Sequence, residues 1–394
     1  MKTVLLCVCG GIAAYKMPAV ASALTKQGYH VHVLMTQNAT EFIAPLTFEE
    51  LTGNRCIVDM FDRSFTRQVE HVALAKQADV CLIAPATANV IAKMAHGIAD
   101  DMVTTTVLAC RCSKLIAPAM NTAMLENPAT QANLQQLQTY GCTVIPPACG
   151  YLACGDTGSG KLPEPSVLLE YLYCELTTPK DLQYLRILVT AGPTQEPLDP
   201  VRCLTNHSTG AMGYAIAQAA ARRGAQVTLI SGPTHLEPPL FVRMIPVVTA
   251  QEMYDAALAQ LDGQDIIIKA AAVADYRPVQ YSQQKIKKGA GESMLSLTRT
   301  PDILAELGKR RAPDQFLCGF CMETENLLEN ARKKLEQKSL DLIAANDLTE
   351  QGAGFGTQTN RLTLITKTTQ TPLPLQSKAD AADALLTAIL QART

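Results

Sequence analysis

The sequence contains no tryptophan, no long apolar run and no excess charge of either sign. Because no uninterrupted apolar stretch reaches the roughly 18 residues that a membrane-spanning helix needs, we expect no membrane partner. Lys and Arg number 34 and Asp and Glu number 36, a formal net charge of −2. The general basic field of a nucleic-acid-binding protein is therefore missing. The 394 residues, 47% of them hydrophobic, suit two folded domains rather than one.

The amino terminus also lacks the features of a cleavable leader. The opening MKTVLLCVCGG has one Lys, its apolar run is broken by Gly10 and Gly11, and no A-x-A cleavage site follows. The 13 cysteines are an odd number scattered through apolar segments, unlike the framework of a small disulfide-rich domain. We therefore expect a cytoplasmic protein in which most of these thiols fill the core.

Short apolar runs alternate with amphipathic segments along the chain, which predicts parallel sheets with helices on both faces. In the first half, strands are expected at 3–9, 30–35, 79–84, 114–118 and 142–146, and helices at 13–27, 88–94, 129–140 and 166–176. After a weak boundary near residue 180, strands are expected at 185–191, 226–231, 242–248, 265–271, 315–320 and 340–344. Helices are expected between them at 212–223, 250–261, 301–310 and 325–338, and Leu362–Thr366 is expected to add an edge strand before a helix at 377–390. The predicted fold is α/β, with two fused doubly wound domains at 1–180 and 181–394.

Three predicted strand ends in the first domain carry small or hydroxyl-bearing residues. Ligands of open α/β sheets bind at the carboxyl ends of the strands, and a Gly pair before a helix lets backbone N–H groups approach a phosphate. No G-x-G-x-x-G opens the domain, so FMN is favoured over a dinucleotide. The candidate cofactor-binding residues at these ends are Gly10, Gly11, Ile12, Thr36, Pro85, Thr87 and Asn89.

The Pro- and Gly-rich segment at 146–165 is too long for an ordinary connection, which indicates a functional lid or a linker. Within it, Gly155 to Lys161 spells G-x-x-x-x-G-K, the start of a phosphate-binding P-loop. Leu162 stands where Ser or Thr would hold Mg²⁺, and the prolines that follow prevent the required helix. We therefore reject a P-loop.

The second domain offers a different phosphate-binding pattern. The run Asn206-His207-Ser208-Thr209-Gly210 precedes an Ala-rich helix, a suitable backbone nest for a phosphate. It is not a G-x-G-x-x-G motif, so NAD is disfavoured. Ala270–Pro278 leads from the predicted sheet centre to Lys285-Ile286-Lys287-Lys288. A lysine cluster is usually a solvated face, but one inside such a loop can close over phosphates.

The motifs of the first half, in their order, resemble those of the FMN-dependent cysteine decarboxylases. They are GGIAAYK from Gly10, PATAN from Pro85, PAMNTAM from Pro118 and the lid sequence ACG…GSGKLPEP. The similarity is greatest to the decarboxylase half of the bacterial bifunctional phosphopantothenoylcysteine decarboxylase/phosphopantothenate–cysteine ligase family. It implies a flavodoxin-like flavoprotein domain with an essential His at His71, a substrate-binding Asn at Asn121 and a lid Cys at Cys154. Leu125 occupies a position where members often carry an aromatic residue.

These residue types suit the chemistry that the resemblance implies. A titratable His serves the first, oxidative stage, and an Asn holds a carboxylate without adding charge that would oppose its loss as CO₂. A Cys on a lid can donate a proton at the final reduction while the lid excludes water. Taken singly, each residue has a plain structural alternative: a packed His71, a local turn at Asn121 and an inert thiol at Cys154.

The second half resembles the ligase half of the same family through N-[HR]-S-[ST]-G, A-A-V-A-D-[YF] and K-I-K-K. The resemblance implies that Asn206 handles an acyl-cytidylate intermediate, that Asp275 and Lys285 contact CTP, and that Arg202 serves the phosphopantothenate site. Mg²⁺ is expected with CTP, with Asp275 as a candidate neighbour. Further nucleotide-contacting positions match Pro301, Asp302, Ile303, Leu304, Phe320, Lys334 and Lys338. Cys318 and Cys321 form a C-x-x-C without thioredoxin context, which we interpret as packing.

The resemblance implies an enzyme of coenzyme A synthesis that joins 4′-phosphopantothenate to L-cysteine with CTP. The product would then be decarboxylated with FMN to 4′-phosphopantetheine. Two alternatives stay open: a flavin-binding regulatory or scaffold protein that has lost one activity, and a decarboxylase of peptides that end in cysteine. The family further implies a homo-oligomer, with trimeric contacts in the first half and dimeric contacts in the second.

Overall fold

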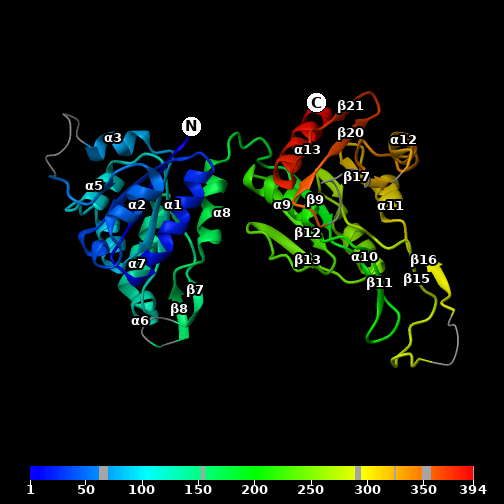
Figure 1. Cartoon of the computed structure of the whole chain (residues 1–394), viewed down its shortest axis with the longest axis horizontal. Coiled ribbons are helices and arrows are strands. Elements are labelled where there is room, and N and C mark those ends of the chain that lie inside the picture. Colours follow the sequence, from blue (N-terminus) through cyan, green and yellow to red (C-terminus); the bar gives the residue numbers. More distant parts are fainter. Residues whose placement is uncertain are drawn as a thin grey trace. The chain divides into compact units, whose positions relative to one another are not determined.

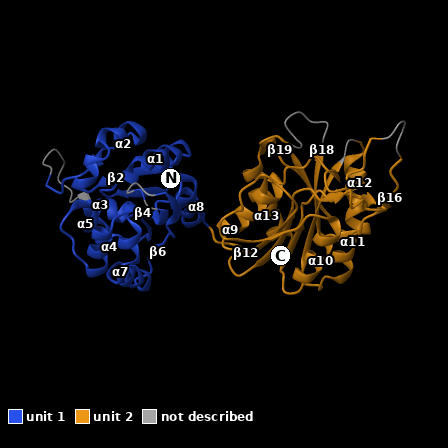
Figure 2. Cartoon of the chain, turned by 90° about the horizontal axis from the view of Figure 1, so that it is seen from below, with its two compact units in different colours: residues 1–178 blue, residues 179–394 orange. Residues whose placement is uncertain are grey.

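The computed structural model describes residues 1–61, 70–151, 155, 157–288, 294–323, 325–347 and 356–393. The chain forms two compact units, Met1–Thr178 and Pro179–Thr394 (Figure 2). Each unit is an α/β domain with its own apolar core, divided between the two faces of its sheet. None of the helices in the described part of the chain has the length and apolar character that a bilayer crossing demands.

A six-stranded parallel sheet forms the centre of unit 1 (Figure 1). Its order is β3-β2-β1-β4-β5-β6, with bounds β1 (Thr3–Val8), β2 (His30–Met35), β3 (Cys56–Ile57), β4 (Val80–Ala86), β5 (Ser113–Pro118) and β6 (Thr143–Val144). Side chains of β1 alternate between two core clusters, because successive residues of a strand point to opposite faces. One face is covered by α1 (Met17–Lys26), α2 (Pro45–Thr52) and α8 (Pro165–Leu176). The other is covered by α3 (Glu70–Gln77), α4 (Ala88–His96), α5 (Met102–Ala109) and α7 (Pro128–Thr139).

Five shorter elements in the described part of unit 1 lie outside these layers. The 3-10 helix η1 (Ile12–Lys16) links β1 to α1, η2 (Gln37–Glu41) follows β2, and α6 (Thr122–Glu126) follows β5. The strands β7 (Ala148–Tyr151) and β8 (Thr157–Lys161) form an antiparallel hairpin beside α6 (Figure 1).

Unit 2 contains a mixed eight-stranded sheet in the order β13-β12-β9-β14-β17-β18-β20-β21. The parallel strands are β9 (Arg186–Ala191), β12 (Gln226–Ser231), β13 (Val242–Pro246), β14 (Ile266–Lys269), β17 (Phe316–Glu323) and β18 (Leu342–Asp347). The antiparallel strands are β20 (Leu362–Thr366) and β21 (Gln370–Pro372). One face is covered by α9 (Ala211–Arg222) and α13 (Lys378–Arg393). The other is covered by α10 (Ala250–Leu261), α11 (Ile303–Arg310) and α12 (Leu327–Gln337).

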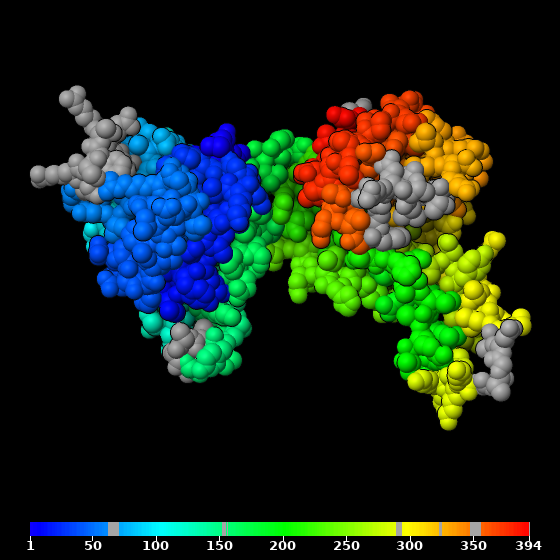
Figure 3. Space-filling model, viewed as in Figure 1, coloured from blue at the N-terminus to red at the C-terminus, as the bar shows by residue number. Residues whose placement is uncertain are grey.

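Three two-stranded pairs complete unit 2. They are β10 (Gln195–Pro197) with β11 (Cys203–Thr205), β15 (Tyr276–Pro278) with β16 (Leu297–Arg299), and β19 (Thr359–Asn360) with β22 (Gln376–Ser377). The first two pairs and the loops beside them project from the rest of unit 2 as an arm, coloured green and yellow in Figure 3.

In both sheets the strand order reverses beside the first strand of the unit. Strand β1 lies between β2 and β4, and β9 lies between β12 and β14. Chain segments that leave the carboxyl ends of two such neighbours turn to opposite faces, which opens a crevice between them. Each unit therefore has one preferred place for a ligand.

The α/β prediction is confirmed, and β2, β12, β20 and α10 have the predicted bounds. The edge-strand prediction for Leu362–Thr366 is wrong, because β20 pairs with β18 on one side and β21 on the other. A turn closed by Thr366 and Thr369, whose hydroxyls lie 2.7 Å apart, returns the chain as β21. The rejected P-loop is confirmed as absent, since Thr157–Lys161 is a strand rather than a loop that opens a helix.

Cysteine packing agrees with the predicted filler role. Cys7, Cys9, Cys81, Cys318 and Cys321 are buried. Burial raises the pKa of the Cys9 thiol to about 12 and also raises that of Cys318. Cys9 and Cys318 therefore stay protonated at neutral pH and pack as small apolar groups.

Gly308 in α11 gives a test of this packing. Alanine normally stabilises a helix interior over glycine by about 1 kcal/mol, but a Cβ at Gly308 would lie only 2.1 Å from the backbone oxygen of Lys338. We expect Gly308→Ala to lower the unfolding free energy of unit 2 by about 1–3 kcal/mol, seen as a lower thermal midpoint. The control Lys309→Ala, on the exposed face of the same helix, should leave the midpoint nearly unchanged. A midpoint raised by Gly308→Ala would contradict this packing.

Candidate sites at the two crevices

The crevice of unit 1 has a cradle for a phosphate-bearing ligand. A Cβ at Gly10 would lie 2.5 Å from the Cβ of Asn38, so the backbone there passes too close for any other residue. A Cβ at Gly11 would meet nothing within 4 Å, and Ile12 is 57% exposed. At the end of the neighbouring strand, the buried hydroxyl of Thr36 has no hydrogen-bond partner in the described chain. An unpartnered buried hydroxyl beside open backbone fits a bound phosphate or hydroxyl.

The end of β4 adds a helix cap to this crevice. The Thr87 hydroxyl accepts a hydrogen bond from the backbone N–H of Val90 at 3.3 Å and caps α4. Pro85 is buried within β4, whereas Asn89 lies exposed in the first turn of α4. The predicted cofactor-binding residues of unit 1 therefore come from the ends of β1, β2 and β4, which are adjacent in the sheet.

The β7–β8 hairpin lies against the segment that follows β5. The backbone N–H of Met120 donates to the Gly160 oxygen at 3.0 Å, and the Thr122 hydroxyl donates to the Ser159 oxygen at 2.7 Å. Neither glycine of β8 has room for a side chain. A Cβ at Gly158 would clash with the Thr122 hydroxyl, and a Cβ at Gly160 would clash with the backbone oxygen of Met120. The predicted lid segment is thus a glycine-dependent hairpin docked beside Asn121.

Lys16 joins the segment that follows this hairpin to η1, which comes directly after the glycine loop of Gly10 and Gly11. Its ammonium group donates to the Leu162 oxygen at 3.1 Å and to Oε1 of Glu164 at 2.8 Å, although the lysine is only 7% exposed. The hydrogen bond from Lys16 lowers the pKa of Glu164. A cavity of about 330 Å³ lies here, lined by Ile12, Ala13, Tyr15, Lys16, Ala119, Met120, Asn121, Tyr151, Gly160, Lys161 and Leu162.

The three predicted catalytic residues of unit 1 differ in their position relative to this cavity. Asn121 lines the cavity, and its Oδ1 accepts the Ala123 N–H at 2.8 Å, so the local capping role is present as well. His71 is half-buried in α3 and does not line the cavity that contains Asn121. Cys154 lies outside the described residues. Leu125, which belongs to α6, is buried in the core at the position where family members often carry an aromatic residue.

In unit 2, a cavity of about 430 Å³ is lined by most of the predicted nucleotide-contacting residues, although not by Lys285 or Phe320. Asp302 caps α11 through the Ala305 N–H at 2.9 Å and forms an ion pair with Lys338. Burial opposes ionisation of Asp302, but the bonds from Lys338 and Ala305 still hold its pKa below its ordinary value. The described lining is Lys269, Val273, Asp275, Tyr276, Arg299, Thr300, Pro301, Asp302, Ile303, Leu304, Lys334 and Lys338.

A second cavity, of about 370 Å³, shares part of this lining. Asn206 and Phe320 line it, and Nδ2 of Asn206 donates to the Ala272 oxygen at 2.9 Å. The loop at 208–210 and the amino end of α9 form another part of its wall. The residues common to both cavities are Lys269, Val273, Asp275 and Lys334. Two ligands bound side by side would therefore meet at these four residues.

Sequence reasoning missed Lys269, which lines both cavities. Burial, followed by repulsion from Lys334, lowers its pKa to about 8, while the carboxylates of Asp302 and Asp275 act in the opposite direction. Its ammonium group donates to the Ala271 oxygen at 2.9 Å. The available signal was a lysine directly after the apolar run Ile266-Ile267-Ile268, at the carboxyl end of a central strand.

Arg202 and Lys285 lie in the projecting arm, and neither is among the described residues that line the two cavities. Nε of Arg202 donates to Asp199 at 3.0 Å, and its guanidinium also reaches the Ile286 oxygen at 2.9 Å. Asp199 accepts the Ile286 N–H at 3.1 Å, and the bond from Arg202 lowers its pKa. The structure therefore joins Arg202 to the segment Lys285–Lys288, called the lysine loop below, rather than to the cavity that Asn206 lines.

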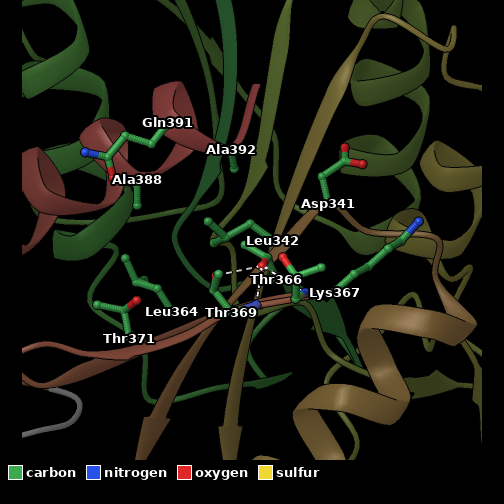
Figure 4. Close-up of a pocket in the computed structure, with 11 residues that line it drawn as sticks. Asp341, Leu342, Leu364, Thr366, Lys367, Thr369, Thr371, Ala388, Gln391 and Ala392 are labelled. Carbon is green, nitrogen blue, oxygen red and sulfur yellow. Dashed lines mark hydrogen bonds between the residues drawn. The ribbon is translucent and has the colours of Figure 1, made fainter. Parts of the chain in front are cut away.

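A third cavity of unit 2, of about 530 Å³, lies at the opposite edge of the sheet (Figure 4). It is lined by the start of β18, the turn at 366–369 and the last turns of α13. None of the predicted site residues lines it. Because ligands of open α/β sheets bind at the carboxyl ends of the strands, size alone does not make this cavity the site.

Comparison with known proteins shows the family of both units. A family model described as flavoprotein matches residues 1–176, and one described as the DNA/pantothenate metabolism flavoprotein C-terminal domain matches residues 182–392. The coenzyme A biosynthesis bifunctional protein CoaBC of Bacillus subtilis is 46% identical over 98% of this chain and 96% of its own length. That of Escherichia coli is 42% identical over 96% and 94%. The chain belongs to the bifunctional CoaBC family.

Two solved structures are similar to parts of this chain. The C-terminal domain of a CoaBC protein is 42% identical and covers 54% of this chain and 97% of that chain, with a TM-score of 0.47. A mutant PPC decarboxylase complexed with pantothenoylaminoethenethiol is 32% identical and covers 43% and 96%, with a TM-score of 0.40. As a member of the CoaBC family, the chain is a bifunctional phosphopantothenoylcysteine decarboxylase and synthetase of coenzyme A biosynthesis.

Lys16 gives a test of how the hairpin is held. In Lys16→Met the donor to Leu162 and Glu164 is lost, so we expect about tenfold faster hydrogen exchange across Thr157–Lys161 at neutral pH, measured by mass spectrometry. Because the pKa of Glu164 is lowered, its share of the interaction is present above the ordinary carboxyl pKa and is lost only below it. The control Lys26→Met, an exposed lysine at the end of α1, should exchange as the wild type does. Equal exchange in both variants would contradict the anchoring role.

Proposed function

We propose that unit 2 uses CTP to join 4′-phosphopantothenate to L-cysteine and that unit 1 uses FMN to decarboxylate the product. The observation that supports this most directly is the pair of adjoining cavities in unit 2, which share Lys269, Asp275 and Lys334. A ligase that activates an acid with a nucleotide must bring both substrates to one junction.

The proposed ligation has two steps. A carboxylate oxygen of the acid bonds to the α-phosphorus of CTP, while the bond to the bridging oxygen breaks and pyrophosphate leaves with its electron pair. The cysteine amine then attacks the acyl carbon, loses a proton and displaces CMP. Lys334 and Lys338 supply positive charge beside the phosphates, and Mg²⁺ bound with CTP would neutralise further charge there. Asn206, in the adjoining cavity, would hold the acyl intermediate.

The crevice of unit 1 fits FMN through the unpartnered Thr36 hydroxyl and the open backbone at Gly11. We infer that Gly10, Gly11, Ile12, Thr36, Pro85, Thr87 and Asn89 hold it. When bound, the flavin would accept electrons from the substrate thiol and return them after CO₂ has left. Asn121 would bind the departing carboxylate, His71 would carry a proton, and Cys154 would donate the last proton.

The alternatives explain less of the molecule. A decarboxylase of peptides that end in cysteine has no use for the two adjoining cavities of unit 2, and a scaffold protein has no use for the lysines that line them. We further propose a cytoplasmic homo-oligomer with trimeric contacts of unit 1 and dimeric contacts of unit 2. This assembly rests on the family resemblance.

Thr36→Val tests the flavin site. The change keeps the side-chain volume but removes the unpartnered hydroxyl, so we expect the Kd for FMN to rise about tenfold, measured by flavin fluorescence on titration. The control Thr25→Val alters a hydroxyl that bonds the Ala21 oxygen within α1 and should leave the Kd unchanged. Wild-type protein that takes up no FMN would refute the cofactor assignment, and an unchanged Kd in Thr36→Val would remove this hydroxyl from the site.

Lys285→Gln tests whether the lysine loop of the arm serves the nucleotide. We expect CTP-dependent pyrophosphate release to fall at least about tenfold, because a cation that closes over phosphates is lost. The control Lys309→Gln, an exposed lysine of α11, should keep the wild-type rate. Wild-type protein that releases no pyrophosphate from CTP would refute the ligase proposal. A wild-type rate in Lys285→Gln would leave the phosphates to Lys334 and Lys338.

A further inference from the structure

The turn that joins β10 to β11 in the arm is built around one buried carboxylate. The side chain of Asp199 is fully buried there, whereas that of Arg202 is 48% exposed. Oδ1 of Asp199 accepts the backbone N–H of Val201 at 2.8 Å and that of Arg202 at 2.9 Å. These bonds close the turn in the manner of an Asx-turn. One oxygen of the carboxylate is thus used within the turn itself.

The other oxygen of Asp199 reaches a segment that is distant in the sequence. Oδ2 accepts the Ile286 N–H at 3.1 Å, and it also accepts Nε of Arg202 at 3.0 Å. Nη2 of Arg202 in turn donates to the Ile286 oxygen at 2.9 Å. Asp199 and Arg202 together therefore hold both polar groups of the Ile286 backbone.

Ile286 is the second residue of the lysine loop, and a further bond holds the chain just before that loop. The backbone N–H of Ser282 donates to the Leu198 oxygen at 3.0 Å. The chain is therefore tied to the β10–β11 turn on both sides of Lys285. The N–H of Ile286 belongs to the peptide bond that follows Lys285, and this bond is planar. Holding it limits the directions in which the Lys285 side chain can leave the backbone.

The local charges explain why a carboxylate makes this contact. The turn contributes Arg202, and the loop contributes three lysines, so these two segments would repel each other without a counter-charge. The hydrogen bond from Arg202 holds the pKa of Asp199 below its ordinary value, and the group therefore stays ionised at neutral pH. Hydrogen bonds to a charged acceptor are stronger than those to a neutral one. An ionised Asp199 thus joins two cationic segments that a neutral side chain would hold less firmly.

We propose that Asp199 is a positioning residue of the ligation, which orders Lys285 by holding the backbone of Ile286. Asp199 is not among the described residues that line the two adjoining cavities, so its effect reaches the nucleotide through the lysine loop. With the turn and the loop joined, Lys285 would meet the phosphates with its backbone already ordered. This inference rests on the proposed function, in which Lys285 closes over the phosphates of CTP.

Asp199→Asn separates the roles of the two oxygens. Its amide oxygen can still accept the N–H groups of Val201 and Arg202, as asparagine does in Asx-turns. Its NH₂ group then faces the Ile286 N–H and the guanidinium, which are donors that it cannot bond. We expect hydrogen exchange across residues 282–288 to become about tenfold faster, measured by mass spectrometry. Exchange within the β10–β11 turn should stay at the wild-type rate.

The test of the role in ligation is a double-mutant cycle in the full-length enzyme. CTP-dependent pyrophosphate release is followed with 4′-phosphopantothenate and cysteine saturating. In the wild-type background, Asp199→Asn should lower kcat/KM for CTP about tenfold. In the Lys285→Gln background, the same change should lower it less than about twofold, because the residue through which Asp199 acts is already gone. The control Asp314→Asn, exposed in the turn before β17, should have no effect in either background.

Three results would overturn this positioning role. They are an equal loss of kcat/KM in both backgrounds, which a general structural defect would give, an unchanged kcat/KM in Asp199→Asn, and a wild-type rate in Lys285→Gln. If Asp199→Asn fails to fold, Ile286→Pro removes the N–H that Asp199 holds and provides the same comparison. Failure of the ligase proposal itself would be distinguishable. The wild-type enzyme would then release no pyrophosphate from CTP, whereas the faster exchange across residues 282–288 would still be seen.

Discussion

The reversal of strand order beside β1 and beside β9 is the constraint on which both sites depend. Because the strands around each reversal are parallel, their carboxyl ends meet at one edge, and the segments that leave them part to opposite faces. In unit 1 this places the glycine loop, Thr36 and the β4 end together. In unit 2 it places Lys269 and the Asp275 segment between two cavities. Packing of the apolar core thus sets the strand order, and the strand order places the residues of both sites.

Local charge explains how a chain of net charge −2 can handle phosphorylated substrates. Lys269, Lys334, Lys338 and Lys378 are gathered around the two adjoining cavities of unit 2. Burial of these ammonium groups disfavours their charged form in the free protein, which lowers the pKa values of Lys269 and Lys378. A bound anion offsets this cost and favours the charged form. Binding and charge are thus coupled where phosphates must be held, and the surface as a whole needs no basic field.

The sequence allowed the α/β class and most of the strands to be predicted, since apolar runs of fixed period mark them directly. The β7–β8 hairpin could not be predicted from apolar periodicity, because its strand Thr157–Lys161 is made of glycine and polar residues. Motif order led to Asn206, Asp275 and the segment from Pro301, and the fold brings these to the cavities. Lys269 and Lys378 escaped notice because only the folded sheet brings single lysines to one wall. Arg202, in contrast, was predicted as a site residue from its motif, but its ion pair with Asp199 could be known only from the structure.

The central claim is that one chain performs two consecutive reactions at two separate crevices. The most direct test supplies the purified enzyme with 4′-phosphopantothenate and with cysteine that carries heavy carbon in its carboxyl group. Labelled CO₂ should appear only when CTP is present, and the preformed ligation product should release CO₂ without CTP. Labelled CO₂ from free cysteine in the absence of CTP, or a CTP requirement for the preformed product, would contradict the account.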